Sequence, residues 1–260
     1  MIQIKNYLFA GLAIFTISSC SKNNTDVIPP VTQELKKTIK TSTINGNISF
    51  EFGPEGKPKQ FIVERPWGSY RYDFIYEPAK ATINVFNIAT NQKEETYQAS
   101  LNDKGHITQL IFDQYDNNGN PTATATTSYS YNAKGLLEMT TSPSSFSKKY
   151  YYDTEGNNIK TEYYNGSGQL INYTENDYSD KLDKCPAHNI NQFTWQGFFL
   201  PALSKKLLNH KKQINAGTNT INFEIGITYE LDAEGFVKKG MVDDLNPAGT
   251  DWSWTFTFDK

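Results

Sequence analysis

The chain has 260 residues, of which 37% are hydrophobic and 14% aromatic, and its formal net charge is −3. This length fits one or two ordinary domains, and the small negative charge provides no basic field of the kind that attracts nucleic acid. Many aromatic and few aliphatic residues favour strands over helices. We therefore expect an all-β protein with a core of aromatic rings and no nucleic-acid partner.

Residues 1–19 have the pattern of a secretion signal. Lys5 precedes the apolar run "YLFAGLAIFTI" (residues 7–17), which is too short to span a bilayer as a helix. The next residues, "ISSC", closely resemble the lipobox of bacterial lipoprotein signal peptides and end at Cys20. The resemblance implies cleavage before Cys20 and lipidation there, and two or more acyl chains anchor a protein stably. The alternative is an ordinary secretory signal that leaves Cys20 as a free thiol.

Residues 20–43 are polar and contain Pro29 and Pro30, a composition that predicts a flexible, lipidated stalk. Ser21 follows the cysteine, and a residue other than Asp at this position implies delivery to the outer membrane by the sorting rule known for lipoproteins. We expect the protein on the periplasmic face of that membrane or on the cell surface. Once Cys20 is lipidated, Cys185 has no cysteine with which to form an internal disulfide.

A short motif recurs through the rest of the chain. An apolar residue is followed by Asp, Asn or Gly and, three positions later, by Gly, and this happens seven times. An Asp or Asn side chain can accept hydrogen bonds from nearby backbone N–H groups, and a Gly three positions later can adopt positive φ. Each copy therefore predicts a β-hairpin turn. The copies open at Gly53, Asn102, Asp116, Asn132, Asp153, Asn165 and Asp232.

Apolar and polar residues alternate between these turns. The final segment shows this clearly, because Trp252, Trp254 and Phe256 share one face and Ser253 and Thr255 the other. Such alternation is typical of an antiparallel sheet with one buried face. For residues 44–260 we expect one up-and-down meander of roughly 13–15 strands, closing into a barrel-like or strongly curved sheet. The ring-rich last strand should be paired or covered, because an exposed edge of this kind aggregates.

One stretch, residues 179–218, interrupts this rhythm as an insertion. Within "PALSKKLLNHKK" (residues 201–212), Leu203, Leu207 and Leu208 have helical spacing after Pro201. The pattern predicts a short amphipathic helix near residues 200–212 that covers one end of the sheet. The alternative is a basic surface that meets lipid headgroups or an anionic partner.

The chain resembles two known groups of proteins. Its aromatic-Asp-x-x-Gly unit is similar to the YD repeat of Rhs and teneurin shells. The order of lipobox, polar stalk, meander and late "FFLPALSKKL" (residues 198–207) resembles more closely a Bacteroides-type lipoprotein family of unknown function with a porin-like fold. This resemblance covers residues 44–260. It implies a curved, barrel-like antiparallel sheet and brings no catalytic residues.

A porin-like fold does not by itself predict a pore. A membrane barrel carries an outward apolar band, whereas charged residues such as Lys160, Glu162 and Glu224 occur in the middle of the predicted strands. If the rings faced lipid, these charges would line a channel instead. A spanning barrel needs no lipid tether, so we expect a barrel or sandwich that is filled with rings and faces water on its outside.

Catalytic chemistry finds little support in the sequence. Of the three histidines, His106 follows a hairpin glycine and is expected to be a solvated strand residue. Cys185 and His188, spaced i and i+3, could bind zinc or form a nucleophile pair, but a closed zinc site needs four ligands. Carboxylates are numerous, and nothing selects a pair of them. We therefore expect no catalytic residue, no metal and no cofactor.

Binding is better supported than catalysis. Aromatic rings stack on sugars, and Trp67 in the turn-like "RPWGSY" and Trp195 in the insertion are the candidate ligand-binding residues. We expect a non-catalytic binding or structural accessory protein of the cell envelope, with a glycan or an envelope protein as partner. The alternatives are a carbohydrate-binding or glycan-processing lipoprotein, and a fragment of an Rhs-type shell that encloses a partner.

Overall fold

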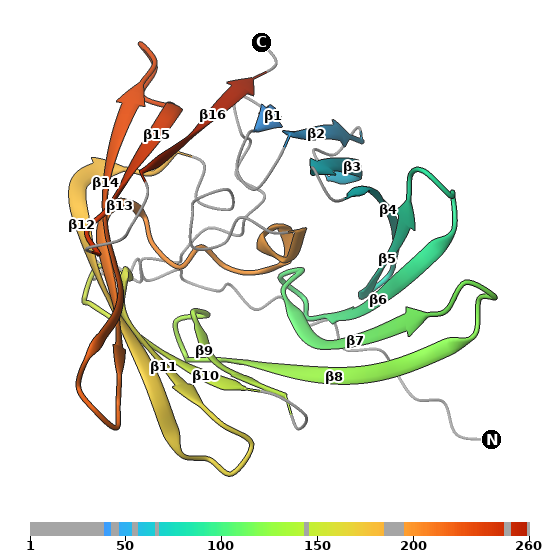
Figure 1. The fold of residues 1–260 in the computed structure, drawn as a ribbon, viewed down its shortest axis with the longest axis horizontal. Coiled ribbons are helices and arrows are strands. Elements are labelled where there is room, and N and C mark those ends of the chain that lie inside the picture. The colour runs from blue at the N-terminus through green and yellow to red at the C-terminus, as the bar shows by residue number, and fades with distance from the viewer. Residues whose placement is uncertain are drawn as a thin grey trace, which may run out of the picture.

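The computed structural model describes residues 39–42, 47–53, 57–65, 68–142, 146–184, 195–246 and 251–258. Within these ranges the protein is one curved antiparallel sheet with a short 3-10 helix inside it (Figure 1). The elements are β1 (Ile39–Ser42), β2 (Asn47–Phe52), β3 (Pro58–Arg65), β4 (Gly68–Glu77), β5 (Lys80–Asn87), β6 (Lys93–Leu101), β7 (Ile107–Tyr115), β8 (Pro121–Tyr131), β9 (Leu137–Thr141), β10 (Ser147–Tyr152), β11 (Asn158–Tyr164), β12 (Leu170–Leu182), η2 (Trp195–Phe199), β13 (Lys206–Asn215), β14 (Ile221–Leu231), β15 (Val237–Asp244) and β16 (Trp252–Phe258).

Every strand from β2 to β16 pairs with its neighbours in the sequence, which confirms the predicted all-β, antiparallel meander. The short strand β1 pairs with both β16 and β2, so the strand order closes into a barrel. The final strand is therefore paired on both edges, as its composition led us to expect. Since β1 begins at Ile39, the sheet includes the end of the stretch predicted to be a stalk.

The repeated motif forms the predicted hairpin turns. At Asp153, the carboxylate Oδ1 accepts hydrogen bonds from the backbone N–H groups of Glu155, at 2.9 Å, and Asn157, at 2.8 Å. Gly156 donates its N–H to the Asp153 carbonyl and has a φ of +91°, which only glycine adopts without strain. The turns that open at Asn102, Asp116, Asn132, Asn165 and Asp232 repeat this arrangement.

The alternating rings face the inside of the barrel, as predicted. One buried cluster spans β2 to β7 and includes Ile83, which has no exposed surface. A second cluster lies on β13 to β16, where Trp254 is 2% exposed and its ring covers Gly240 on the neighbouring strand. Trp252, expected in the core, is instead 41% exposed, although its ring lies 5.5 Å from that of Trp254.

The helix predicted near residues 200–212 is wrong. Residues 206–215 form β13, which is hydrogen-bonded to β12 and β14, and the 3-10 helix lies earlier, at residues 195–199. As a strand, this segment forms backbone hydrogen bonds with neighbours on both edges. This tertiary pairing outweighs the weak preference for a helix that the leucine spacing indicates. Leu203, Leu207 and Leu208 are buried nonetheless, so the pattern identified the apolar residues and misassigned their geometry.

Residues 196–205, which we call the plug, cross the inside of the barrel. Figure 1 shows η2 within the ring of strands, where Phe198 and Phe199 pack against rings from β2 and β4. At the other end of the plug, the Ser204 hydroxyl donates to Asn157 Oδ1 at 2.9 Å, and the Lys205 N–H donates to the same oxygen at 3.1 Å. The plug thus lies inside the barrel, near the end at which the Asn157 turn lies, whereas a helix over one end of the sheet was predicted.

The same hairpin turn has different surroundings at the two ends of the barrel. The connections β6–β7, β8–β9, β10–β11 and β14–β15 lie at the plug end, and the residues that follow their glycines are buried. These residues are His106, Leu136, Asn157 and Phe236. At the opposite end, the equivalent Asn120 and Gln169 are exposed. The prediction that His106 is solvated is therefore wrong, because the residue lies on the covered side of its turn.

Candidate functional site

The inner face of the barrel changes character between β9 and β13. Strand register places Lys148 opposite Tyr163, and Tyr150 opposite Thr161, on this face. Thr161 is followed across the sheet by Thr174 and then by Gln213. The apolar lining of the preceding strands thus gives way to hydroxyl, amide and ammonium groups. We call Lys148, Tyr150, Tyr163, Thr174, Lys211 and Gln213 the lysine–tyrosine patch.

Lys148 lies on β10 with its ammonium group facing the barrel interior. Its Nζ lies 5.5 Å from the centre of the Tyr163 ring. Among the described residues, no carboxylate lies within ion-pair distance of this nitrogen. Burial lowers the pKa of the Lys148 ammonium, because water no longer fully solvates the charged form.

Lys211 lies on β13, directly opposite the buried Asn176 of β12 and the buried Ile225 of β14. Burial lowers the pKa of the Lys211 ammonium, and the positive charge of Lys148 lowers it further. Two ammonium groups therefore face the same interior and act on each other. Desolvation and the repulsion between the two charges both disfavour the charged forms.

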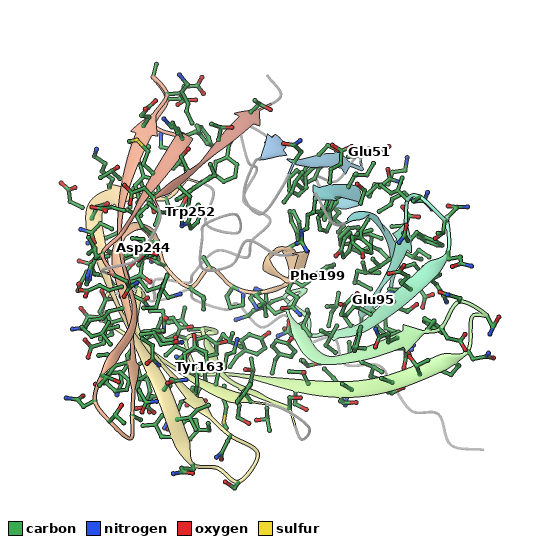
Figure 2. All side chains as sticks on the ribbon, in the orientation of Figure 1. Glu51, Glu95, Tyr163, Phe199, Asp244 and Trp252 are labelled. Carbon is green, nitrogen blue, oxygen red and sulfur yellow. The ribbon has the colours of Figure 1, made fainter. Side chains whose placement is uncertain are left out.

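The tyrosines of the patch supply ring faces and hydroxyl groups. Burial raises the pKa of Tyr150 and of Tyr163, so both phenols stay protonated, while the neighbouring hydroxyls of Thr140 and Thr174 oppose these shifts. Figure 2 shows Tyr163 on the inner side of the strands. The patch therefore combines aromatic surface, neutral hydrogen-bonding groups and positive charge, which together suit a polar organic anion.

The outward face of the same strands is a closed polar network. Glu162 Oε2 accepts hydrogen bonds from the Tyr151 and Tyr164 hydroxyls, each at 2.5 Å, and Oε1 accepts one from Lys160 at 2.8 Å. Burial acts to raise the pKa of Glu162, but these donors outweigh it and lower the pKa to about 2. The carboxylate is held ionised with its hydrogen-bonding capacity used. Glu162, one of the many carboxylates of the sequence, is thereby assigned to the framework.

A second outward group surrounds His210, which the sequence placed in a helix. Its Nδ1 lies 3.1 Å from Asp177 Oδ2 and its Nε2 lies 2.9 Å from Glu224 Oε1. Next to it, Lys212 pairs with Glu175 at 2.7 Å. Within the described ranges, no three His, Cys, Asp or Glu side chains come together in a way that could hold a metal ion.

Most of the site residues predicted from the sequence lie outside the described residues. These are Cys20, Trp67, Cys185 and His188. Trp195 is the first residue of η2, and only its backbone is described. The lipidation site and the candidate tryptophans therefore remain predictions.

The sequence analysis missed the lysine–tyrosine patch. The helical interpretation of residues 201–212 assigned Lys211 and Lys212 to one polar side, whereas in β13 they point to opposite faces of the sheet. A signal was available at Lys148, which shares the period-two face of Tyr150 and Tyr152 next to the "YYYDTEG" turn. A lysine in phase with inward rings is a polar residue at a core position.

The chain is similar in structure to several solved proteins. The chain matches a porin-like protein from Bacteroides uniformis with a TM-score of 0.58 and 12% sequence identity, over 86% of this chain and 99% of that one. A porin-like protein from Bacteroides vulgatus matches with a TM-score of 0.47 and 13% identity, over 85% and 98% of the two chains. The Photorhabdus luminescens Tc holotoxin pore matches at 0.25 and 12%, over 79% of this chain and 11% of that one.

Neither a family model nor a curated protein matches the sequence. The similarity to the Bacteroides uniformis protein shows that the chain has a porin-like, all-β fold, as the resemblance predicted. In the part of the chain that the structure describes, no helix has the length and hydropathy needed to cross a membrane.

Proposed function

We propose that this protein is a lipid-anchored, non-catalytic binding protein of the bacterial outer membrane that takes its ligand on the inner face of the barrel. The observation that carries the proposal is the lysine–tyrosine patch. Charged groups on a buried inner face carry a desolvation cost that apolar residues at the same positions would not carry. Residues that cost stability are typical of functional sites.

The outer wall of the barrel supports the proposed mode of attachment. Across β11 to β14, outward charges alternate in sign along one row from Lys160 through Glu175 and Lys212 to Glu224. A wall that faces lipid is apolar, whereas these charges suit water. Attachment would then fall to the acylated Cys20, which implies a tethered domain with a wetted exterior.

Labelling with a radioactive fatty acid tests the anchor. We expect the wild-type protein to incorporate the label and to sediment with outer membranes. The Cys20→Ala variant should incorporate none and should leave the membrane fraction. A wild-type protein that is recovered without fatty acid would remove the anchor from the proposal and leave the binding role to be tested separately.

Thermal-shift screening of envelope glycans against the full-length protein in detergent tests the binding role. A ligand that binds the native state raises the Tm in a concentration-dependent way. We expect at least one glycan class to do so in the wild-type protein and to lose its effect in Lys148→Met. If no glycan shifts the Tm, the binding proposal is wrong.

Carbohydrate is the class of ligand that the patch favours over a protein partner. Tyr150 and Tyr163, which are half-buried, present ring surface on the same inner face as the amide of Gln213, a combination that suits a sugar ring and its hydroxyl groups. The shell alternative is less well supported, because Phe199 of the plug packs within the barrel where an enclosed partner would lie.

A further inference from the structure

We infer that the lysine–tyrosine patch binds the carboxylate of an acidic sugar. This inference rests on the proposed binding function and names its ligand class. It follows from the positions of the cations, from the groups that surround them, and from the contrast between the two faces of the same strands.

The first step concerns charge. Lys148 and Lys211 both face the barrel interior from strands on the two sides of β11 and β12. On the outward face of this wall, by contrast, Lys160 and Lys212 each have a carboxylate within 2.8 Å. Lys148 has no described carboxylate within ion-pair distance. A ligand carboxylate would supply the missing charge through a charge-assisted hydrogen bond.

The second step concerns size. Tyr150, Thr161, Thr174 and Gln213 form one row across β10 to β13. Adjacent strands are about 4.8 Å apart, so the row extends over roughly 14 Å. This length exceeds a single inorganic anion and matches two or three sugar units. Tyr150 and Gln213, which are half-buried, lie at the two ends of the row, and Thr161 and Thr174 between them are buried. The two end groups are neutral, and they suit hydroxyl groups better than further negative charge.

The third step concerns access. Lys148 and Tyr163 lie near the end of the barrel opposite the plug, since β10 begins and β11 ends there. The residues nearer the plug, Asn158 and Asn176, are buried and are hydrogen-bonded to each other, with Nδ2 of Asn176 donating to Asn158. The polar inner face thus has an occupied part beneath the plug, at the level of Asn176 and Lys211, and a part farther from it that carries Lys148 and Tyr163.

Isothermal titration of the full-length protein in detergent with trigalacturonate, its methyl ester and inorganic phosphate tests the inference. Trigalacturonate should bind, and the ester, which keeps the rings and loses the charge, should bind at least about tenfold more weakly. Lys148→Met should reduce trigalacturonate affinity by about 10- to 100-fold, and Lys148→Arg should retain most of it. The exposed Lys149→Met, one residue away on the outward face, should bind like wild type.

Each other outcome overturns a defined part of the account. Equal binding of acid and ester would contradict the anionic ligand while keeping a carbohydrate-binding protein. Phosphate binding that depends on Lys148, without binding of trigalacturonate, would contradict the sugar. Binding of neither the acid nor the ester would overturn this inference, while the proposed binding function would still stand or fall with the thermal-shift screen of envelope glycans. A Lys148→Met protein with unchanged circular dichroism and unchanged affinity would remove Lys148 from the site.

Discussion

Two regions of the inner face are built from the same hairpin meander but differ in the side chains that point inward. On β2 to β7 the inward residues are rings and aliphatic side chains, and they pack against one another and against the plug. On β9 to β13 the inward residues include Lys148 and Lys211, with threonine, tyrosine and amide groups around them. The first region holds the barrel together. We expect the second to contribute less to stability, because burial disfavours the charged forms of Lys148 and Lys211.

The comparison predicts its largest effect in the apolar region. Ile83→Ala removes a side chain with no exposed surface and leaves a cavity, so unfolding free energy should fall by about 2–5 kcal/mol. Ile75, on the neighbouring strand, is 50% exposed, and Ile75→Ala is the matched control with a change below about 1 kcal/mol. Urea unfolding measures both. Equal losses in the two variants would contradict the burial of Ile83 in the apolar cluster.

The second apolar cluster offers a test of close packing. A Cβ at Gly240 would lie 2.1 Å from the Trp254 ring, so Gly240→Ala must displace that ring and should cost about 1–3 kcal/mol. At Gly226, on the next strand, the nearest atom would be 3.9 Å away. Gly226→Ala should be neutral or slightly stabilising. A Gly240→Ala variant as stable as wild type would contradict the position of Trp254.

Because the plug contacts only one of two equivalent turn residues, we expect their alanine variants to differ in stability. Asn157→Ala removes the acceptor used by Ser204 and Lys205, and it should cost about 1–3 kcal/mol because buried donors lose their partner. Asn120 has the same place in its own turn at the other end and is exposed. Asn120→Ala should change stability by less than about 0.5 kcal/mol. Chemical denaturation of the pair would show whether the plug is attached at Asn157.

The outward network predicts a pH dependence. The pKa of Glu162 is about 2 in the folded protein and about 4.3 in an unfolded chain. Since the folded value is lowered, its stabilisation is complete above about pH 4.3 and is lost as the pH falls toward 2. Glu162→Gln should lower the Tm at pH 7 and flatten this acid dependence, whereas the exposed Glu138→Gln should change neither. A steeper acid loss in Glu162→Gln would contradict the assignment.

Several features of the fold could be predicted from the sequence because they depend on local chemistry. The Asp153 turn needs only its own carboxylate and Gly156, and the inward phase of Tyr150 and Tyr152 follows from strand geometry. The β13 strand could not be predicted from Leu203, Leu207 and Leu208, because its partners are 30 or more residues away in places. Burial of His106 also depends on a distant segment, since the turn alone leaves that position exposed at Asn120.

The candidate site depended on the same non-local information. Lys148 and Lys211 are 63 residues apart, and only the strand order of β10 to β13 brings their side chains to one face. The candidate site depends on the threonine, tyrosine and amide groups around the two lysines, and these groups come together only in the folded sheet. The prediction that Trp67 and Trp195 bind a ligand used only their local sequence context.

The most direct test of the division between the two regions is the unfolding free energy of Lys148→Met at pH 7, measured by urea denaturation beside Ile83→Ala. Because the folded pKa of Lys148 is lowered, the charged form is penalised at neutral pH, and the penalty fades as the pH rises toward the unfolded value of about 10.4. We predict that Lys148→Met is as stable as wild type or more stable. A loss as large as that of Ile83→Ala would mean that Lys148 holds the barrel together, and would contradict a patch retained for binding.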